Sequence, residues 1–315
     1  MNGIGKLALG TMGMNFGNKE SSIRTIQTAL KNDIRIFNTG DFYQKGASQV
    51  VLGEALKDVV REEYFISLKF GVTFSLTGAK LDVRPANIRP QLEAALTAMG
   101  LSYVDLYQPA RQDITIPVED IMEEMVKLKE EGLIRHIGLS EVDADTLRRA
   151  HKVHPVHSVE VEYSLLNREI EKELIPTAKE LGVQVVVYGA VGHGVLTDKV
   201  VNGGMDNPMM ARGILSPLHK KHNLQILNAL ADIARNRGLS MSELALAWTQ
   251  AKYDNILSLI GTTSPEHFLS SLKAMETALD DATVAEIERM VSTQTIKGHT
   301  MRKWVFENGV GRMES

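Results

Sequence analysis

Short apolar runs alternate with stretches of helical periodicity along this chain of 315 residues, and that alternation restricts its possible folds more than any other feature. Eight of the runs predict strands, and several are nearly continuous, as expected for strands buried on both faces. We place them at Leu7–Thr11, Ile34–Asn38, Tyr64–Lys69, Val104–Gln108, Ile134–Gly138, Val156–Val161, Val183–Tyr188 and Ile256–Ile260. Eight strand–helix units predict a closed barrel whose functional residues lie at the C-terminal ends of the strands.

Apolar residues at three- and four-residue spacing predict the helices. They lie at Ile23–Leu30, Val50–Leu56, Ile88–Met99, Ile121–Leu128, Leu147–Ala150, Ile175–Leu181, Leu224–Ala234, Met241–Ala251, Glu266–Leu279 and Thr283–Val291. Two helices rather than one precede the eighth strand, and the second begins with a capping box formed by Ser240 and Glu243. The predicted fold class is therefore α/β: a single (β/α)8 TIM barrel with two extra helices in its C-terminal half and a C-terminal tail, without a domain boundary in residues 1–315.

Three segments lie outside this repeat. Gly71–Pro90 and Gly189–His222 are long loops on the predicted C-terminal face of the barrel, where long loops usually serve binding. The tail after the last helix carries Trp304 and Phe306. These aromatic side chains either pack the tail against the barrel or face a substrate pocket, and the sequence leaves both readings open.

Composition and charge restrict the function classes. A net charge of −4 and a pI of about 6.2 give no global electrostatic reason to bind nucleic acid or an anionic membrane. The absence of cysteine excludes disulfides, thiolate metal sites and a cysteine nucleophile. Because no apolar run approaches the roughly 20 residues of a membrane span, and the N-terminus lacks a signal-peptide pattern, we expect a soluble cytoplasmic protein.

Three histidines at three-residue spacing raise the question of a metal site. They are His151, His154 and His157. Pro155 interrupts any helix there, and the segment precedes a strand on the face opposite the predicted site. We therefore predict surface turn residues and no metal.

A tyrosine and a lysine end neighbouring predicted strands. Tyr43 follows the second strand and Lys69 ends the third. A tyrosine hydroxyl titrates near ~10, and a nearby ammonium favours the phenolate and lowers that pKa. Such a pair can protonate an oxygen while hydride reaches the adjacent carbon. Spacing alone equally fits a rim tyrosine bonded to solvent and a lysine paired at the surface, because such pairs are common in α/β proteins.

The order and spacing of several motifs resemble the aldo-keto reductase family from about Gly5 to Val291. The motifs are LALGTMGM, IRIFNTGDFY, VVLGEAL, GLIRHIGLS, VEVEYSLLNR, VVVYGAVGHGVL and ELALAWT followed by LIGTTSPEHFLSSL. LYQPAR followed by Asp113, together with TGDFY, is more similar to a bacterial branch related to pyridoxal reductases. The resemblance implies a (β/α)8 barrel that binds NADP(H) without a Rossmann domain, and the chain accordingly lacks a G-x-G-x-x-G motif after its first strand.

The family's catalytic tetrad is Asp, Tyr, Lys and His. By resemblance Tyr43 is the general acid and Lys69 its partner, whereas the acidic position falls on Asn38 and the histidine position on Ala110. Asn38 cannot neutralise Lys69, so the lysine should lose some protonation or find another anion. Ala110 cannot donate to a substrate carbonyl, and losing one such donor typically costs about 10²–10³ in rate. Arg111 follows, but in a regular strand it would point away from the barrel interior.

The resemblance assigns the nicotinamide carboxamide of the cofactor to three side chains. They are Ser140, Glu141 and Glu160, and the last two stand where the family usually has Asn and Gln. A carboxylate accepts from the amide NH₂ group but cannot donate to the amide oxygen unless it is protonated. The carboxamide contacts are therefore expected to differ from those of the family.

Two further segments carry the remaining cofactor contacts that the resemblance implies. In the first, Tyr188 would stack on the nicotinamide ring, and backbone N–H groups would bind the pyrophosphate from Gly189, Gly194 and Leu196. In the second, Gly261–Ser271, the 2′-phosphate and adenine would meet Thr262, Thr263, Ser264, His267 and Ser271. No Lys or Arg lies in that segment, so the preference for NADPH over NADH should be weak.

The predicted function is reduction of a small aldehyde or ketone by hydride transfer, with NADP(H) or alternatively NAD(H) as cofactor and Tyr43 as proton donor. The expected partner is thus a small-molecule carbonyl substrate. Asn38→Asp is expected to raise activity or cofactor-dependent stability, because it would place an anion beside Lys69. Four departures from the family pattern leave an alternative open, a degenerate family member acting as a nucleotide-binding or regulatory module: Asn38, Ala110, Glu141 and Glu160.

Overall fold

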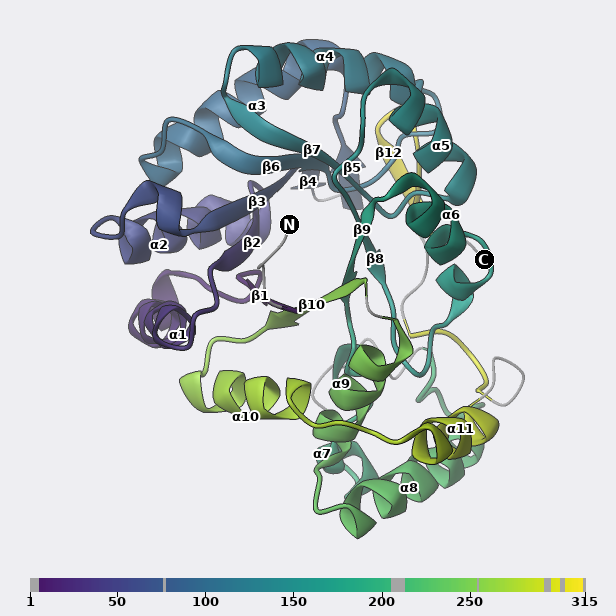
Figure 1. Ribbon diagram of the computed structural model, residues 1–315. Coiled ribbons are helices and arrows are strands. Elements are labelled where there is room, and N and C mark those ends of the chain that lie inside the picture. The colour runs from purple at the N-terminus through teal and green to yellow at the C-terminus, as the bar shows by residue number, and fades with distance from the viewer. Residues whose placement is uncertain are drawn as a thin grey trace.

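Eight parallel strands close into a barrel, and helices surround it (Figure 1). The computed structural model describes residues 6–75, 78–204, 213–253, 255–291, 296–300 and 304–313. In barrel order the strands are β1 (Leu7–Gly10), β10 (Ile256–Gly261), β9 (Gln184–Tyr188), β8 (Ser158–Glu162), β7 (Ile134–Ser140), β6 (Val104–Pro109), β3 (Phe65–Phe70) and β2 (Ile36–Gly40). All eight predicted strands are confirmed, with ends within two residues of the prediction.

Ten of the helices correspond to the predicted helical stretches, whereas the short helix α7 (Asp198–Val201) lies inside the predicted long loop Gly189–His222. The other helices are α1 (Lys19–Lys31), α2 (Ala47–Leu56), α3 (Pro85–Met99), α4 (Val118–Glu130), α5 (Ala144–Val153), α6 (Leu174–Leu181), α8 (Lys220–Asn236), α9 (Met241–Lys252), α10 (Pro265–Met275) and α11 (Asp281–Met290). Helices α8 and α9 both precede β10, as the sequence predicts. The capping box at the start of α9 is present, with Ser240 Oγ accepting from the Glu243 N–H and the Glu243 side chain accepting from the Ser240 N–H.

Burial on both faces explains the continuous apolar runs of the strands. Every residue of β1, β2 and β8 is buried, because one face packs in the barrel interior and the other against the helices. The few polar residues of these strands are therefore buried as well. A charged or amide side chain that faces such an interior must find partners there, because an unpaired buried polar group is costly.

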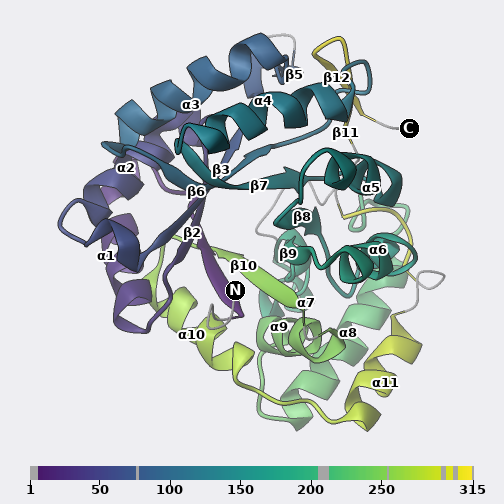
Figure 2. The ribbon, with the colours of Figure 1, turned by 45° about the horizontal axis from the view of Figure 1, so that its top comes forward.

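A small antiparallel sheet forms where the sequence predicts only a loop and a tail. Its strand order is β11 (Trp304–Glu307), β12 (Val310–Met313), β5 (Gly78–Leu81) and β4 (Val72–Ser75). Figure 2 shows β5 and β12 side by side, although they lie far apart in the sequence. Because β4 follows directly on the end of β3, this sheet lies at the C-terminal end of the barrel. Four-residue strands paired across the whole chain leave too little local periodicity to be predicted.

Asp113 anchors the C-terminal hairpin to the barrel. Its carboxylate, 1% exposed, accepts hydrogen bonds from the Thr115 N–H and hydroxyl (2.9 and 2.6 Å) and from the Gly309 N–H (2.6 Å). Phe306, on β11, is 2% exposed and belongs to the main core, so the packing reading holds for this residue. The side chain of Trp304 lies outside the described residues.

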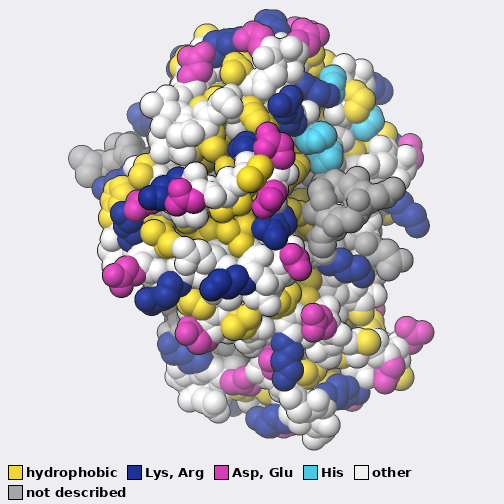
Figure 3. Space-filling model, turned by 60° about the vertical axis from the view of Figure 1, so that its left-hand side comes forward, with side chains coloured by type: hydrophobic (Ala, Val, Ile, Leu, Met, Phe, Trp, Pro, Cys, Tyr) yellow, Lys and Arg dark blue, Asp and Glu magenta, His cyan; other side chains and the backbone are white. Residues whose placement is uncertain are grey.

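The surface carries charges of both signs. On the face shown in Figure 3, Lys and Arg side chains are interspersed with Asp and Glu, and hydrophobic side chains lie between them. Among the helices that the structure describes, none is long and apolar enough to cross a membrane.

Candidate active site

Four polar side chains from four different strands meet inside the barrel near its C-terminal end. They are Asn38 on β2, Lys69 on β3, Gln108 on β6 and Glu160 on β8, and each is at most 3% exposed. Strand register sets their level, since Gly40 pairs with Lys69 and Lys69 with Gln108. Side chains alternate along a strand, so these four point inward together.

The Glu160 carboxylate is the centre of this group. Its Oε1 accepts from the Lys69 ammonium at 2.8 Å, and its Oε2 accepts from the side-chain amides of Asn38 and Gln108, both at 2.7 Å. Lys69 also donates to Asn38 Oδ1, and Ser67 Oγ accepts from both amides at 3.2 and 3.3 Å. All partners of the carboxylate are donors, as an ionised carboxylate requires. The result is a buried ion pair with both oxygens hydrogen-bonded.

This arrangement shows how Lys69 is neutralised although position 38 is an asparagine. Of the two predicted outcomes, loss of protonation or another anion, the second is confirmed, because Glu160 pairs with the lysine. Burial, the largest single effect, disfavours the charged lysine, but the Glu160 carboxylate and the Tyr43 hydroxyl together raise the pKa of Lys69 above its usual value. The expectation that an aspartate at position 38 would raise activity loses its basis, because Lys69 already has its anion.

The predicted role of Glu160 as a carboxamide ligand stays a prediction. In this structure its carboxylate binds Lys69, Asn38 and Gln108, and Oε1 accepts from Lys69 alone, so this oxygen keeps a free lone pair. The sequence could not show this, because Glu160 and Lys69 lie on strands that are not neighbours and meet only across the barrel.

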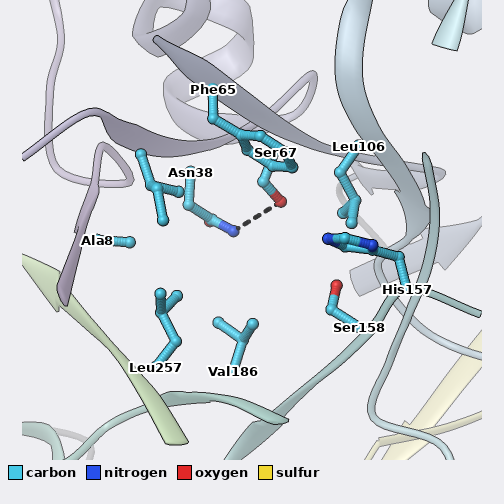
Figure 4. Close-up of a pocket in the computed structure, with 10 residues that line it drawn as sticks. Ala8, Asn38, Phe65, Ser67, Leu106, His157, Ser158, Val186 and Leu257 are labelled. Carbon is cyan, nitrogen blue, oxygen red and sulfur yellow. Dashed lines mark hydrogen bonds between the residues drawn. The ribbon is translucent and has the colours of Figure 1, made fainter. Parts of the chain in front are cut away.

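A cavity lies beneath the network, toward the N-terminal ends of the strands. Figure 4 shows Asn38 and Ser67 turned toward each other, with Val186 and Leu257 across the cavity and Ala8 at its side next to Asn38. The network therefore sits on a largely apolar floor that offers few competing partners. Gln108 needs extra room beside it, and Gly138 supplies this room, since a Cβ there would lie 2.9 Å from Gln108 Oε1.

Tyr43 lies beside this ion pair. It opens a 3-10 turn, Tyr43–Gly46, just after β2, and Lys69 Nζ lies 5.2 Å from the centroid of its ring. Burial raises the pKa of the Tyr43 hydroxyl above its usual value, and the opposing effect of Lys69 does not cancel it. The expected lowering effect of Lys69 is present, but burial exceeds it and the net shift is upward. Tyr43 keeps its proton, as a proton donor must.

Arg111 contradicts a second expectation. Strand β6 ends at Pro109, so the in–out alternation no longer applies at Ala110 and Arg111. The guanidinium donates to the Ala110 carbonyl at 2.6 Å and lies 3.5 Å from the Tyr188 hydroxyl. It is thus turned toward the site and not away from it, while Ala110 is buried and leaves the histidine position empty of donors.

Two predicted carboxamide ligands lie on the rim next to the network. Ser140, at the end of β7, pairs in register with Glu160, and its Oγ is buried without a hydrogen-bond partner among the described residues. Glu141 has a left-handed backbone (φ 54°), which is unusual for this residue type. Its Oε1 accepts from the Tyr188 hydroxyl and the Glu162 N–H, both at 2.8 Å, which fixes the side chain in place.

In the loop after β9, backbone N–H groups donate hydrogen bonds within the loop itself. The N–H groups of Gly194 and Leu196 donate to the Val191 carbonyl, each at 3.1 Å, so these two predicted pyrophosphate donors are occupied in this conformation. The Glu162 carboxylate, at the end of β8, lies 3.1 Å from His193 Nε2 and accepts from the Thr300 hydroxyl at 2.5 Å. It thereby joins the loop that begins at Gly189 to the C-terminal segment.

The predicted adenosine-binding residues lie at the start of α10. Ser264 caps the helix: its Oγ accepts from the His267 N–H at 3.2 Å and donates to the Glu266 carboxylate at 2.7 Å. Thr262 Oγ1 accepts from the Ser264 N–H at 3.1 Å, and Ser271 donates to the His267 carbonyl at 2.9 Å. Glu266 places a carboxylate in the first turn of α10, in the segment that is predicted to meet the 2′-phosphate.

The three spaced histidines have different surroundings. His154 Nε2 contacts the Lys129 ammonium at 3.1 Å, whereas His157 stacks on His136 with ring centroids 4.0 Å apart. Burial lowers the pKa of His157 to about 4. Within the described part of the chain, no group of three or more His, Cys, Asp or Glu side chains could hold a metal ion.

The chain and its barrel are similar to known proteins. The model of the aldo/keto reductase family matches residues 6–292. A probable aldo-keto reductase 1 from Glycine max is 31% identical over 303 residues, covering 94% of this chain and 88% of that protein. The structure of a glycerol dehydrogenase from Gluconobacter oxydans is similar with a TM-score of 0.81 and 24% identity over 92% of this chain and 93% of that one. An aldo-keto reductase from Klebsiella pneumoniae in complex with NADPH has a TM-score of 0.73 and 21% identity over 93% and 95%. The chain belongs to the aldo-keto reductase family, and the predicted family and barrel are confirmed.

Asp41 is a rim residue that the sequence analysis did not single out. It follows β2, two residues before Tyr43, and its Oδ1 is buried without a partner among the described residues. Burial raises the pKa of this carboxyl to about 7, although the N–H groups of Gly71 and Phe42 act in the opposite direction. No pattern signals it, because a lone acidic residue after a strand is common.

We predict that Asp41 makes the fold less stable as pH rises. Its pKa is higher in the folded state, so between about pH 4 and 7 the folded protein binds more protons, and the free energy of unfolding falls with pH by at most about 1.4 kcal/mol per unit. Urea unfolding from pH 5 to 8 should show this decline in the wild type and not in Asp41→Asn. Asp58→Asn, at an exposed position, is the control and should keep the wild-type slope. Parallel profiles for wild type and Asp41→Asn would refute the assignment.

Proposed function

We propose that this protein reduces small aldehydes or ketones with NADP(H), with Tyr43 as the proton donor. The observation that carries the proposal is the buried Lys69–Glu160 ion pair at 2.8 Å beside Tyr43. A site that had lost its function would gain nothing by keeping an ion pair in this position, since removing two charges from water costs several kcal/mol per ion. The site instead keeps a tyrosine, a charged lysine and an anion together.

The chemistry assigned to these side chains is proton transfer to a developing alkoxide. Tyr43 donates its hydroxyl proton to the carbonyl oxygen of the substrate, and the charged Lys69 favours the phenolate that remains. Glu160 holds Lys69 in its charged form throughout. NADP(H), when bound, supplies the hydride for the carbonyl carbon. The high pKa of Tyr43 ensures that the proton is present when the substrate arrives.

One feature supports a nicotinamide cofactor in particular. Ser140 Oγ is fully buried and has no partner among the described residues, at the position where the resemblance predicts a carboxamide contact. An unpartnered buried hydroxyl is costly, and an amide group would satisfy it. Ser140 and Tyr188 would therefore hold the carboxamide and the nicotinamide ring, and the relative crystallised with NADPH agrees with this choice of cofactor. We place the protein in the cytoplasm, as the sequence suggested.

The proton donor can be tested directly. NADPH oxidation with an aromatic aldehyde should fall by about 10²–10⁴-fold in Tyr43→Phe, because the general acid is lost. Tyr103→Phe is the matched control: this tyrosine packs under Arg61 and Arg135, and its variant should keep wild-type rates. NADPH binding, followed by protein fluorescence, should survive in both variants. Equal rates for wild type and Tyr43→Phe would sink the assignment, and absence of NADPH binding would favour a cofactor-free module.

Cofactor choice gives a second test. The segment Gly261–Ser271 contains no Lys or Arg, and the Glu266 carboxylate in the first turn of α10 would repel a 2′-phosphate. We therefore expect NADPH to be preferred over NADH by less than about a hundredfold in dissociation constant at low ionic strength. Glu266→Gln should shift the ratio toward NADPH, whereas Glu276→Gln, at the other end of the same helix, should not. A larger wild-type preference would contradict this reading.

A further inference from the structure

The Arg111 guanidinium stands in the site with most of its donors unused. Its contacts in the described structure are the Ala110 carbonyl at 2.6 Å and the Tyr188 hydroxyl at 3.5 Å. A guanidinium carries five N–H donors in a fixed fork, so at least three remain. Its Nε has no hydrogen-bond partner and is not among the fully buried unpartnered atoms, so at least this edge of the guanidinium is accessible. Arg111 is only half-buried as a residue.

In the described structure, the charged groups around Arg111 do not form an ion pair with it. Glu160 and Glu141 both interact with it electrostatically, as do Tyr43 and Tyr188. Glu160 is already neutralised by Lys69 at 2.8 Å. Glu141 directs Oε1 to the Tyr188 hydroxyl and the Glu162 N–H, and in the described structure neither glutamate forms an ion pair with Arg111. Arg111 is therefore a cation near the proton donor without a carboxylate partner of its own.

Because Ala110 stands where the family has a histidine, the Arg111 cation can take over the orientation of the substrate. Ala110 offers no donor to orient a substrate carbonyl, so a neutral aldehyde would be held only by Tyr43 at its reacting end. A substrate with a carboxylate could instead be oriented by its own charge, because the planar fork of arginine binds carboxylates through two parallel hydrogen bonds. Orientation of this kind contributes to rate by holding the reacting atoms in place.

We propose that Arg111 selects carbonyl substrates that carry a carboxylate, and that this contact replaces the orienting role absent at Ala110. The inference rests on the proposed reductase function and names its substrate class: aldehydes or ketones bearing an acid group. Tyr43 still supplies the proton, and Arg111 binds the part of the substrate that does not react. Arg111 is thus a specificity determinant of the site.

The experiment compares 3-carboxybenzaldehyde with its neutral methyl ester. The wild type should turn over the acid with a kcat/KM about tenfold or more above that of the ester at low ionic strength, since a charge-assisted hydrogen bond is lost with the ester. Arg111→Met should bring the ratio of kcat/KM for the acid to that for the ester down to about one. Arg111→Lys should retain part of the preference, because the charge stays and the fork is lost. Arg148→Met, on the outer helix α5, is the control and should behave as wild type.

The outcomes separate this inference from the proposed function. An unchanged preference in Arg111→Met, or an equal loss with both substrates, would overturn the inference, while turnover of the ester by the wild type would still support the reductase. If the wild type reduces neither compound, the proposed function fails on its own. Binding of benzoate by calorimetry then tests Arg111 without turnover: about tenfold weaker binding in Arg111→Met supports the contact, and equal binding refutes it.

Discussion

The ion pair between Lys69 and Glu160 is the interaction on which the site depends. The two side chains come from β3 and β8, with β6 and β7 between them in the barrel order, so the pair crosses the barrel interior. Taking both charges out of water is costly, and their attraction offsets this only when the remaining polar atoms are satisfied. Asn38 and Gln108 satisfy the second carboxylate oxygen, and Gly138 leaves the space that Gln108 needs.

Seen one residue at a time, Asn38 and Glu160 are two departures from the family pattern. In space they compensate for each other: relative to the pattern that the resemblance implies, the carboxylate beside Lys69 comes from β8 and not from β2, and the amide comes from β2, an exchange that leaves Lys69 with one anion and one amide. The exchange also engages Glu160 with Lys69, Asn38 and Gln108 at the position where a carboxamide contact is predicted. Ser140, with an unpartnered buried hydroxyl, is left as the donor there, while Glu141 is engaged by Tyr188. Substitutions that look disabling separately can therefore leave the charge balance of a site intact.

The sequence predicts the barrel well, because strands buried on both faces appear as continuous apolar runs. Helices buried on one face appear as stretches with apolar residues at helical spacing. It also places Tyr43 and Lys69 at the same end of the barrel, since the ends of parallel strands coincide. It cannot tell which inward side chains touch across the interior, and so it does not pair Glu160 with Lys69. Arg111 is misplaced because alternation was extended past the end of β6. The small sheet of β4, β5, β11 and β12 is missed because its pairing depends on contacts between distant segments that carry little local signal.

The most direct measurement of the central claim is a double-mutant cycle at positions 38 and 160, with urea unfolding and Tyr43-dependent reduction as the two readouts. Glu160→Gln leaves Lys69 buried without an anion, which should cost about 3–5 kcal/mol of stability. Asn38→Asp sets two carboxylates around one lysine and should also lower stability and rate. Combining the two substitutions returns a single carboxylate to Lys69, so the double variant should recover most of both quantities. A double variant that loses as much as the two single variants together would contradict the exchange of charge between β2 and β8.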